Sequence, residues 1–234
     1  MTREYDGFAA DYAAENETSL LNAYYERPAM LDLAGDVAGR RILDVGCGTG
    51  ALSAALRDRG ALVAGFDSST EMLALARQRL GEDADLQLAD LGEPLPYADA
   101  SFDDVVASLV LHYLRDWEEP LAELRRVLTP GGRLILSVNH PFAYPLIVEG
   151  AKYFPTVDWP MEVTVAGRTV TLSTTHRPLH AMVDAFAAAG FRIVTIAEPP
   201  VAVDTPQELI PDHIEGRLRF ISFIFFVLQS PPTP

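Results

Sequence analysis

The chain has 234 residues, a length at which a globular protein commonly folds as one domain around a continuous core. Hydrophobic residues make up 49% of the sequence and charged residues 22%, which excludes a disordered or fibrous protein. The 33 acidic residues outnumber the 18 basic ones, and no cluster of Lys or Arg interrupts the resulting charge of −15. Because such a surface repels phosphate, we expect neither nucleic acid nor an anionic membrane as a partner.

The number of cysteines and the length of the apolar segments indicate the cellular compartment of the protein. A single cysteine, Cys47, excludes an internal disulfide and fits a reducing compartment. The charged start, residues 1–4, lacks the apolar stretch of a secretory signal. The longest apolar run, 220–228, is shorter than the roughly 20 residues that span a bilayer, so we expect a buried strand there. These features predict a cytoplasmic protein.

Strand-like and helix-like segments alternate along the chain, an order typical of a parallel sheet with helical crossovers. Ser68 and Glu71 have the spacing of a capping box, which predicts a helix that opens at Ser68 and ends at Gly81. Further helices are expected over 51–59, around the apolar positions 121–128 up to a turn at 129–132, and from Pro178 to Gly190. We expect seven strands, over 41–45, 62–66, 86–89, 104–108, 133–138, 191–196 and 219–228.

The segment 140–177 interrupts this order with proline, aromatic and histidine residues. Within it, 163–165 and 168–172 flank Ala166-Gly167, a pattern that predicts a small hairpin over the edge of the sheet. A decorative surface loop is one interpretation. A lid or substrate wall is the one we favour, because insertions beside the carboxyl ends of parallel strands commonly shape the ligand crevice.

Three alternating glycines, Gly46, Gly48 and Gly50, follow the first strand directly. Glycine allows a sharp turn and a close approach of the backbone to a ligand, so a nucleotide-type site is favoured over a plain strand-to-helix turn. Asp67 follows Gly46 by 21 residues, at the end of the next strand, where a carboxylate can accept hydrogen bonds from both ribose hydroxyls. The alternative for Asp67 is a helix N-cap.

These motifs resemble the class I S-adenosylmethionine-dependent methyltransferases, in particular the small ubiquinone-biosynthesis-like group. Residues 42–50 resemble the family's first motif, and 124–134 resemble its helix, turn and fifth strand. Asp67 occupies the position of the family's ribose-binding acid, and Ala89-Asp90 occupies that of its adenine-contacting pair. Residues 101–106 and 189–191 are also similar to segments of the family. The resemblance implies a doubly wound, mostly parallel seven-stranded α/β sheet with an antiparallel edge strand and a small lid insertion. It further implies one domain over 1–234, with a helical cap over 1–35.

The resemblance also implies which residues bind S-adenosylmethionine. Gly46 and Gly48 approach the methionine part, and Ser108 lies beside its amine. Asp90 meets the adenine amino group, Leu91 offers its backbone to the adenine ring, and Met72 packs on it. Tyr5 and Tyr12 are similar to an aromatic pair that closes over the cofactor, where an aromatic face stabilises the sulfonium cation. The implied cofactor-binding set is Tyr12, Asp44, Gly46, Cys47, Gly48, Asp67, Ser68, Met72, Asp90, Leu91 and Ser108.

The implied activity is transfer of the cofactor's methyl group to an oxygen, nitrogen or carbon atom of a small-molecule acceptor. A nicotinamide-dependent oxidoreductase is the rival enzyme, but its fingerprint is G-x-G-x-x-G, whereas Ala51 follows Gly50 here. A cofactor-binding module without catalysis is the other alternative. The aromatic residues Phe142, Tyr144, Tyr153, Phe154 and Trp159 indicate either an apolar or aromatic acceptor or a small core of the lid itself.

Histidines supply the candidate for a general base. His140 follows the fifth strand at the ligand-binding edge of the sheet, so we expect it to take a proton from an oxygen or carbon acceptor. The alternative is that His140 caps a loop or packs under the lid. His112 is expected to be structural, and His213 carries no signal. His176 and His180 have metal-ligand spacing, but Pro178 separates them and no third ligand is near, so we expect no metal.

Overall fold

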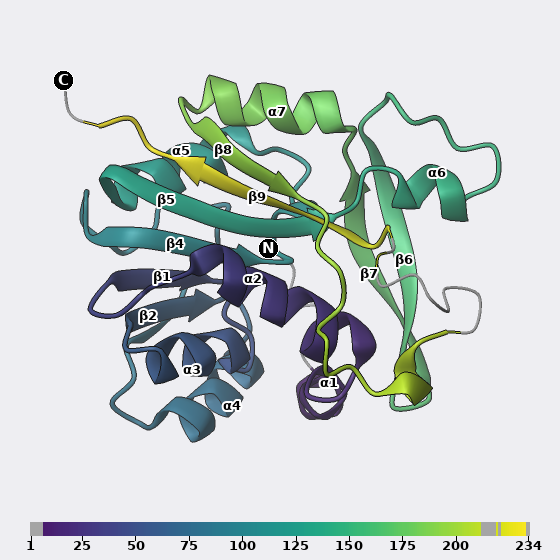
Figure 1. The fold of residues 1–234 in the computed structure, drawn as a ribbon, viewed down its shortest axis with the longest axis horizontal. Coiled ribbons are helices and arrows are strands. Elements are labelled where there is room, and N and C mark those ends of the chain that lie inside the picture. The colour runs from purple at the N-terminus through teal and green to yellow at the C-terminus, as the bar shows by residue number, and fades with distance from the viewer. Residues whose placement is uncertain (1–6, 212–218, 220, 233–234) are drawn as a thin grey trace.

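The computed structural model describes residues 7–211, 219 and 221–232, and its centre is a seven-stranded sheet (Figure 1). The sheet order is β3-β2-β1-β4-β5-β9-β8. Strands pair in parallel from β3 to β5, and β9 is antiparallel to both of its neighbours. The predicted fold class is therefore confirmed, with β9 as the antiparallel strand beside the outermost strand β8. The bounds are β1 Arg41–Val45, β2 Leu62–Asp67, β3 Leu86–Leu88, β4 Phe102–Ser108, β5 Leu128–Asn139, β8 Arg192–Ala197 and β9 Phe223–Gln229.

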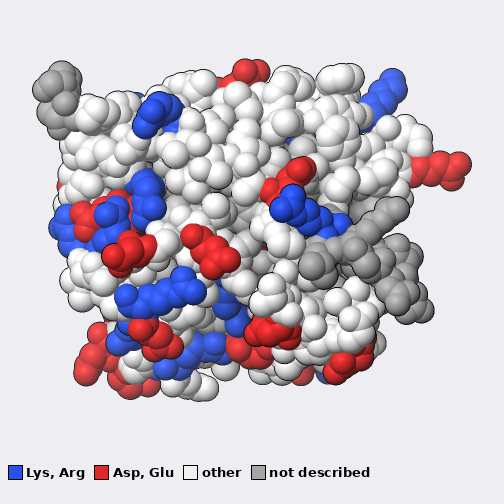
Figure 2. Space-filling model, in the orientation of Figure 1, with Lys and Arg blue, Asp and Glu red and all other residues white. Residues whose placement is uncertain are grey.

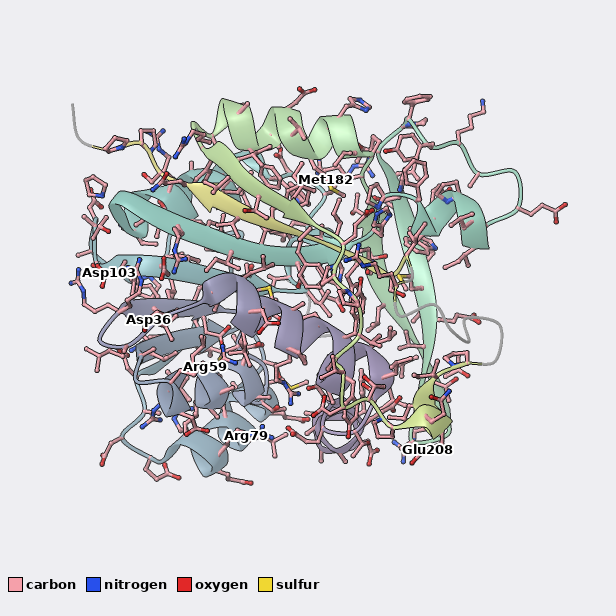
Figure 3. All side chains as sticks on the ribbon, viewed as in Figure 1. Asp36, Arg59, Arg79, Asp103, Met182 and Glu208 are labelled. Atoms are coloured by element: carbon pink, nitrogen blue, oxygen red, sulfur yellow. The ribbon has the colours of Figure 1, made fainter. Side chains whose placement is uncertain are left out.

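Helices cover both faces of this sheet, because alternate residues of its central strands point to opposite sides. Leu43 and Val105 pack with α5 (Glu118–Val127) and α7 (Leu179–Ala188), whose Met182 points into this layer (Figure 3). Ile42 and Val106 pack with α2 (Arg27–Ala34) and α3 (Ala51–Asp58) on the other face. Helix α4 (Thr70–Leu80) packs beside α3 and β3.

The amino-terminal elements are α1 (Ala9–Asn16) and a π-helix, η1 (Asn22–Glu26), which runs directly into α2. An ion pair of 2.6 Å between Arg79 and Glu17 joins α4 to the residue after α1 (Figure 3). These elements occupy most of the predicted cap. Tyr5 and His213 lie outside the described residues. No helix in the described part of the chain is long and apolar enough to cross a bilayer.

Three predicted boundaries are wrong. The last strand, expected over 219–228, begins at Phe223 as β9. Ser69, not Ser68, caps α4: its hydroxyl accepts the Met72 N–H at 3.2 Å, so the expected capping box does not form. Strand β5 begins at Leu128, which pairs with Phe102, and it therefore includes 129–132, where a turn was expected. A register shift between Phe102 and Asp104 accommodates these residues within the ladder.

The predicted hairpin is present and longer than expected, with β6 Val157–Val165 paired to β7 Arg168–His176 as a second, two-stranded sheet. Its turn residues, Ala166 and Gly167, have positive φ angles of 49° and 76°, as a two-residue hairpin turn requires. The same insertion contains the short helix α6 (Ala143–Ile147). Strand β7 packs against η2 (Leu111–Tyr113), a 3₁₀ turn that follows β4, while η3 (Gln207–Leu209) lies in the loop before β9.

Charged residues are intermixed on the surface rather than gathered in one basic stripe on the face drawn in Figure 2. Arg126, for example, forms ion pairs of 2.8 Å with both Asp99 and Glu123. At the amino-terminal ends of β4 and β5, the buried carboxylate of Asp104 is bonded by both Arg40 and Arg133. This cluster lies at the opposite edge of the sheet from the carboxyl ends of β1 and β4.

Candidate cofactor and acceptor cavity

A cavity of about 540 Å³ opens at the carboxyl ends of β1, β2 and β4. The amino-terminal helices, the glycine turn and the β6–β7 hairpin supply its walls. Ligands of open α/β sheets bind at this edge, where the connections after the strands converge. Nine predicted cofactor-binding residues line the cavity, namely Tyr12, Asp44, Gly46, Cys47, Gly48, Asp67, Ser68, Met72 and Ser108.

The glycine turn forms one wall because its backbone adopts left-handed conformations. Gly46 and Gly48 have φ angles of 62° and 54°. A Cβ built on Gly48 would meet no protein atom within 4 Å, so the space beside it is open to a ligand. Gly50 differs, since a Cβ there would lie 2.9 Å from Leu80. Gly48 therefore borders an open space that can hold a ligand, and we call this space the Gly48 cradle. Gly50 instead permits close helix packing.

Asp67 is held at the end of β2 with both carboxylate oxygens oriented. One oxygen accepts the Gly48 N–H at 2.9 Å, and the other accepts the Ser69 N–H at 2.9 Å. The carboxylate thus ties the glycine turn to the start of α4 while its residue lines the cavity. The Ser69 contact also accounts for the cap-like position that was the alternative for Asp67.

Buried acidic groups surround the same space. Burial raises the pKa of Asp44 to about 7, although the Ser53 hydroxyl donates to it at 2.6 Å. Burial also raises the pKa of Glu26 above its usual range. Negative charges of Glu26 and Asp67 raise the Asp44 pKa further, so the carboxylates oppose one another's ionisation. A cationic ligand would relieve this repulsion.

Glu26 is a cavity residue that sequence analysis missed. Its Oε1 accepts hydrogen bonds from the hydroxyls of Ser108 at 2.7 Å and Ser137 at 2.6 Å, which joins η1 to β4 and β5. The local signal was weak, because one acidic residue in a helical segment normally faces solvent. The π-helical turn rotates it toward the sheet, and such turns are frequent at functional sites.

Comparisons with known proteins agree with this geometry. A family model described as a methyltransferase domain matches residues 43–136. A solved S-adenosylmethionine-dependent methyltransferase from Mesorhizobium loti superposes with a TM-score of 0.64 at 26% identity, covering 87% of this chain and 96% of that one. Over these residues and in its fold, the chain is similar to the class I S-adenosylmethionine-dependent methyltransferases. The cofactor of this family is S-adenosylmethionine.

Curated relatives are similar to part of this chain. A demethylmenaquinone methyltransferase of Renibacterium salmoninarum is 36% identical over 151 residues, which cover 64% of this chain and 63% of the relative. One from Thermus thermophilus is 41% identical over 115 residues, covering 47% and 52%. The chain thus spans about half to three-fifths of the length of these two relatives. The [4+2]-cyclase SpnF shares the fold at a TM-score of 0.57 and 24% identity, covering 88% of this chain and 81% of that one.

Three residues predicted for the methyltransferase site do not line the cavity: Asp90, Leu91 and His140. Asp90 accepts the Gly92 N–H at 2.8 Å in the turn after β3. Leu91 is 1% exposed within the core layer beneath α5 and α7. Their contacts with adenine therefore stay predictions.

His140 is buried beside the cavity with both ring nitrogens engaged. Its Nδ1 accepts the Phe142 N–H at 3.1 Å, so the neutral ring carries its proton on Nε2, which lies 2.7 Å from Glu198 Oε1. A ring held in this way lacks a free acceptor nitrogen for a substrate proton. The contacts match the alternative of a loop-capping histidine, and the general-base role stays a prediction without support from them.

The insertion's aromatic residues pack on one another. Phe142 stacks on Tyr153 with ring centroids 4.7 Å apart, and Tyr144 lies 4.6 Å from His176. None of the five aromatic residues singled out from the sequence lines the cavity. Of the two interpretations, their packing favours the small core of the insertion. Among the described residues, no group of three or more His, Cys, Asp or Glu has the arrangement of a metal site.

Gly48→Ala is expected to weaken S-adenosylmethionine binding at least tenfold while the protein still folds. The added methyl group projects into space that no protein atom occupies, and the left-handed backbone costs about 1 to 2 kcal/mol of stability. Isothermal titration calorimetry measures the affinity, and a melting curve measures folding. In the matched variant Gly50→Ala the new methyl group meets Leu80, so stability should fall further than in Gly48→Ala. Unchanged affinity in Gly48→Ala would contradict the cradle.

Proposed function

We propose that this protein transfers the methyl group of S-adenosylmethionine to an oxygen, nitrogen or carbon atom of a small, largely apolar molecule. The observation that carries the proposal is the cavity itself. It joins the Gly48 cradle and the Asp67 carboxylate to an apolar end beneath the β6–β7 hairpin. One space can therefore hold a polar, positively charged cofactor and an apolar acceptor next to each other.

The residues at the glycine end fit the cofactor. The Gly46 and Gly48 backbone would approach the methionine part, Asp67 the ribose hydroxyls, and Met72 the adenine ring. The carboxylates of Glu26 and Asp44 complement a cofactor that carries a sulfonium and an ammonium group. Tyr12 lines the same wall, where its ring could contact the sulfonium.

The acceptor end is built by the insertion, and we assign residues 140–177 the role of a substrate wall. Met161, Val163, Val165 and Leu172 of the hairpin line the cavity together with Phe223 of β9. Apolar walls of this kind favour an apolar acceptor. The two curated relatives described above are named for demethylmenaquinone, and apolar contacts of this kind would suit an acceptor of that class.

The chain's contribution to the reaction is positional. When bound, the cofactor supplies a methyl carbon that is already electrophilic. The cavity walls would hold the acceptor atom in line with that carbon, an effect that can supply much of the rate enhancement. We further propose that 1–234 acts as one domain with its helical cap over 1–35, and that it functions in the cytoplasm.

A thermal-shift measurement tests cofactor choice. S-adenosylmethionine at 100 times its dissociation constant should add about 2.7 kcal/mol to the free energy of unfolding, because it binds only the folded state. NAD and NADP should leave the melting temperature unchanged. A shift with NAD alone would favour the oxidoreductase alternative and contradict the proposal.

A further inference from the structure

His112 stands at the acceptor end of the cavity. It belongs to η2, the turn that follows β4 and packs against β7 of the hairpin, and its residue is 6% exposed while lining the cavity. The adjacent Tyr113 ring lies 4.5 Å away, centroid to centroid. This histidine was expected to be structural, and such a role would require its ring nitrogens to be bonded within the protein.

The ring of His112 is not bonded in that way. Its Nδ1 is buried and has no hydrogen-bond partner among the described residues. Burial lowers the pKa of His112 to about 3, so the imidazole is neutral at physiological pH and offers one donor and one acceptor nitrogen. A buried polar atom without a partner destabilises the free protein. Its presence in a cavity wall is therefore a sign that the residue has a role in binding.

Two other polar side chains of this wall already have partners. The Thr174 hydroxyl donates to the Trp159 carbonyl at 2.5 Å. The Asn139 amide donates to the Met161 sulfur at 3.5 Å. Apolar side chains of the hairpin make up much of this wall, so a molecule bound here would find a hydrogen-bonding group in His112 and hydrophobic contacts beside it.

We propose that His112 recognises a hydroxyl group on the acceptor, so that the acceptor is an apolar molecule bearing at least one hydroxyl. The inference rests on the proposed function, because it concerns the acceptor end of the same cavity. The neutral imidazole has one donor and one acceptor nitrogen, so it can form this hydrogen bond with the hydroxyl. His112 thereby selects hydroxylated acceptors over apolar molecules of the same shape.

A binding experiment with two probes of matched shape tests this selection. Wild type and His112→Leu, each saturated with S-adenosylhomocysteine, are titrated with 2-naphthol and with 2-methylnaphthalene. The preference for 2-naphthol should fall roughly tenfold in His112→Leu, because the variant lacks the group that pairs with the hydroxyl. As a matched control, Val163→Ala removes an apolar contact of the same wall and should weaken both probes by a similar factor.

Stability gives an independent readout. Loss of an unpartnered buried nitrogen predicts that His112→Leu melts at or above the wild-type temperature, whereas a structural histidine with internal partners would give a lower melting temperature. Imidazole ¹⁵N shifts of His112 in the wild type provide a second measurement that needs no variant. They should move with 2-naphthol and stay unchanged with 2-methylnaphthalene.

The outcomes separate this inference from the proposed function. Failure of S-adenosylmethionine to stabilise the wild type would contradict the function itself. With the cofactor bound, an equal preference in wild type and His112→Leu, or no binding of 2-naphthol by the wild type, would overturn the role of His112 alone.

Discussion

Asp104→Ala should lower the free energy of unfolding by about 3 kcal/mol, the lower part of the range for breaking a buried ion pair. Asp104 is fully buried and accepts hydrogen bonds from both Arg40 and Arg133, which extend from the end of the α2–β1 connection and from β5. The variant leaves two guanidinium groups without their carboxylate, and only their partial exposure moderates the cost. Urea denaturation monitored by circular dichroism measures the change.

The neighbouring Asp103 provides the matched control. It pairs with Arg41 at 3.5 Å, and both side chains are substantially exposed, so Asp103→Ala should cost about 1 kcal/mol or less. The Asp104 cluster lies at the edge of the sheet away from the cavity, so folded Asp104→Ala should bind S-adenosylmethionine with wild-type affinity. Equal destabilisation by the two variants would show that the buried cluster is not the main tie between β4 and β5 at this edge.

Asp67→Asn should weaken S-adenosylmethionine binding by roughly 10- to 100-fold, because a charge-assisted pair of hydrogen bonds to the ribose is lost. Asparagine keeps one oxygen that can accept the Gly48 N–H, so the variant should still fold. Alanine is a less informative replacement, because it also removes both backbone contacts of the carboxylate. Calorimetric titration gives the affinity, and a melting curve confirms that the variant folds.

Asp90→Asn is the control for this prediction. Asp90 does not line the cavity, and asparagine can still accept the Gly92 N–H, so the affinity should change less than in Asp67→Asn. Wild-type affinity in a folded Asp67→Asn variant would remove the ribose assignment. A larger loss in Asp90→Asn would shift the main polar recognition from the ribose toward the adenine.

Much of the sheet could be predicted from the sequence because its strands carry strong local signals. The run 41–45 is apolar and ends in glycines, and this pattern locates both β1 and the turn that follows it. Strand β5 was predicted to start late, because a Pro-Gly-Gly sequence normally marks a turn. Only the long-range pairing of Leu128 with Phe102 places its first residues in the sheet.

The candidate site was predictable where it depends on backbone geometry and was missed where it depends on packing. Gly48 and Asp67 follow strands at a spacing that the sequence displays, and the structure brings them within hydrogen-bonding distance. Glu26 and His112 carry no comparable signal, since their burial results from a π-helical turn and from the hairpin packed over η2. His140 shows the reverse case: its position after β5 is as expected, but its nitrogens bond to Phe142 and Glu198.

An assay of methyl transfer is the most direct test of the proposed function. The protein is incubated with S-adenosylmethionine labelled in the methyl group and with a panel of demethylmenaquinone reduced to its hydroquinone, phenols, carboxylates, amines and activated carbon acids. We expect S-adenosylhomocysteine to be released in step with label entering an apolar, hydroxyl-bearing acceptor. Tight cofactor binding without release of S-adenosylhomocysteine above the acceptor-free control, across the whole panel, would contradict the proposed function and favour a cofactor-binding module without catalysis.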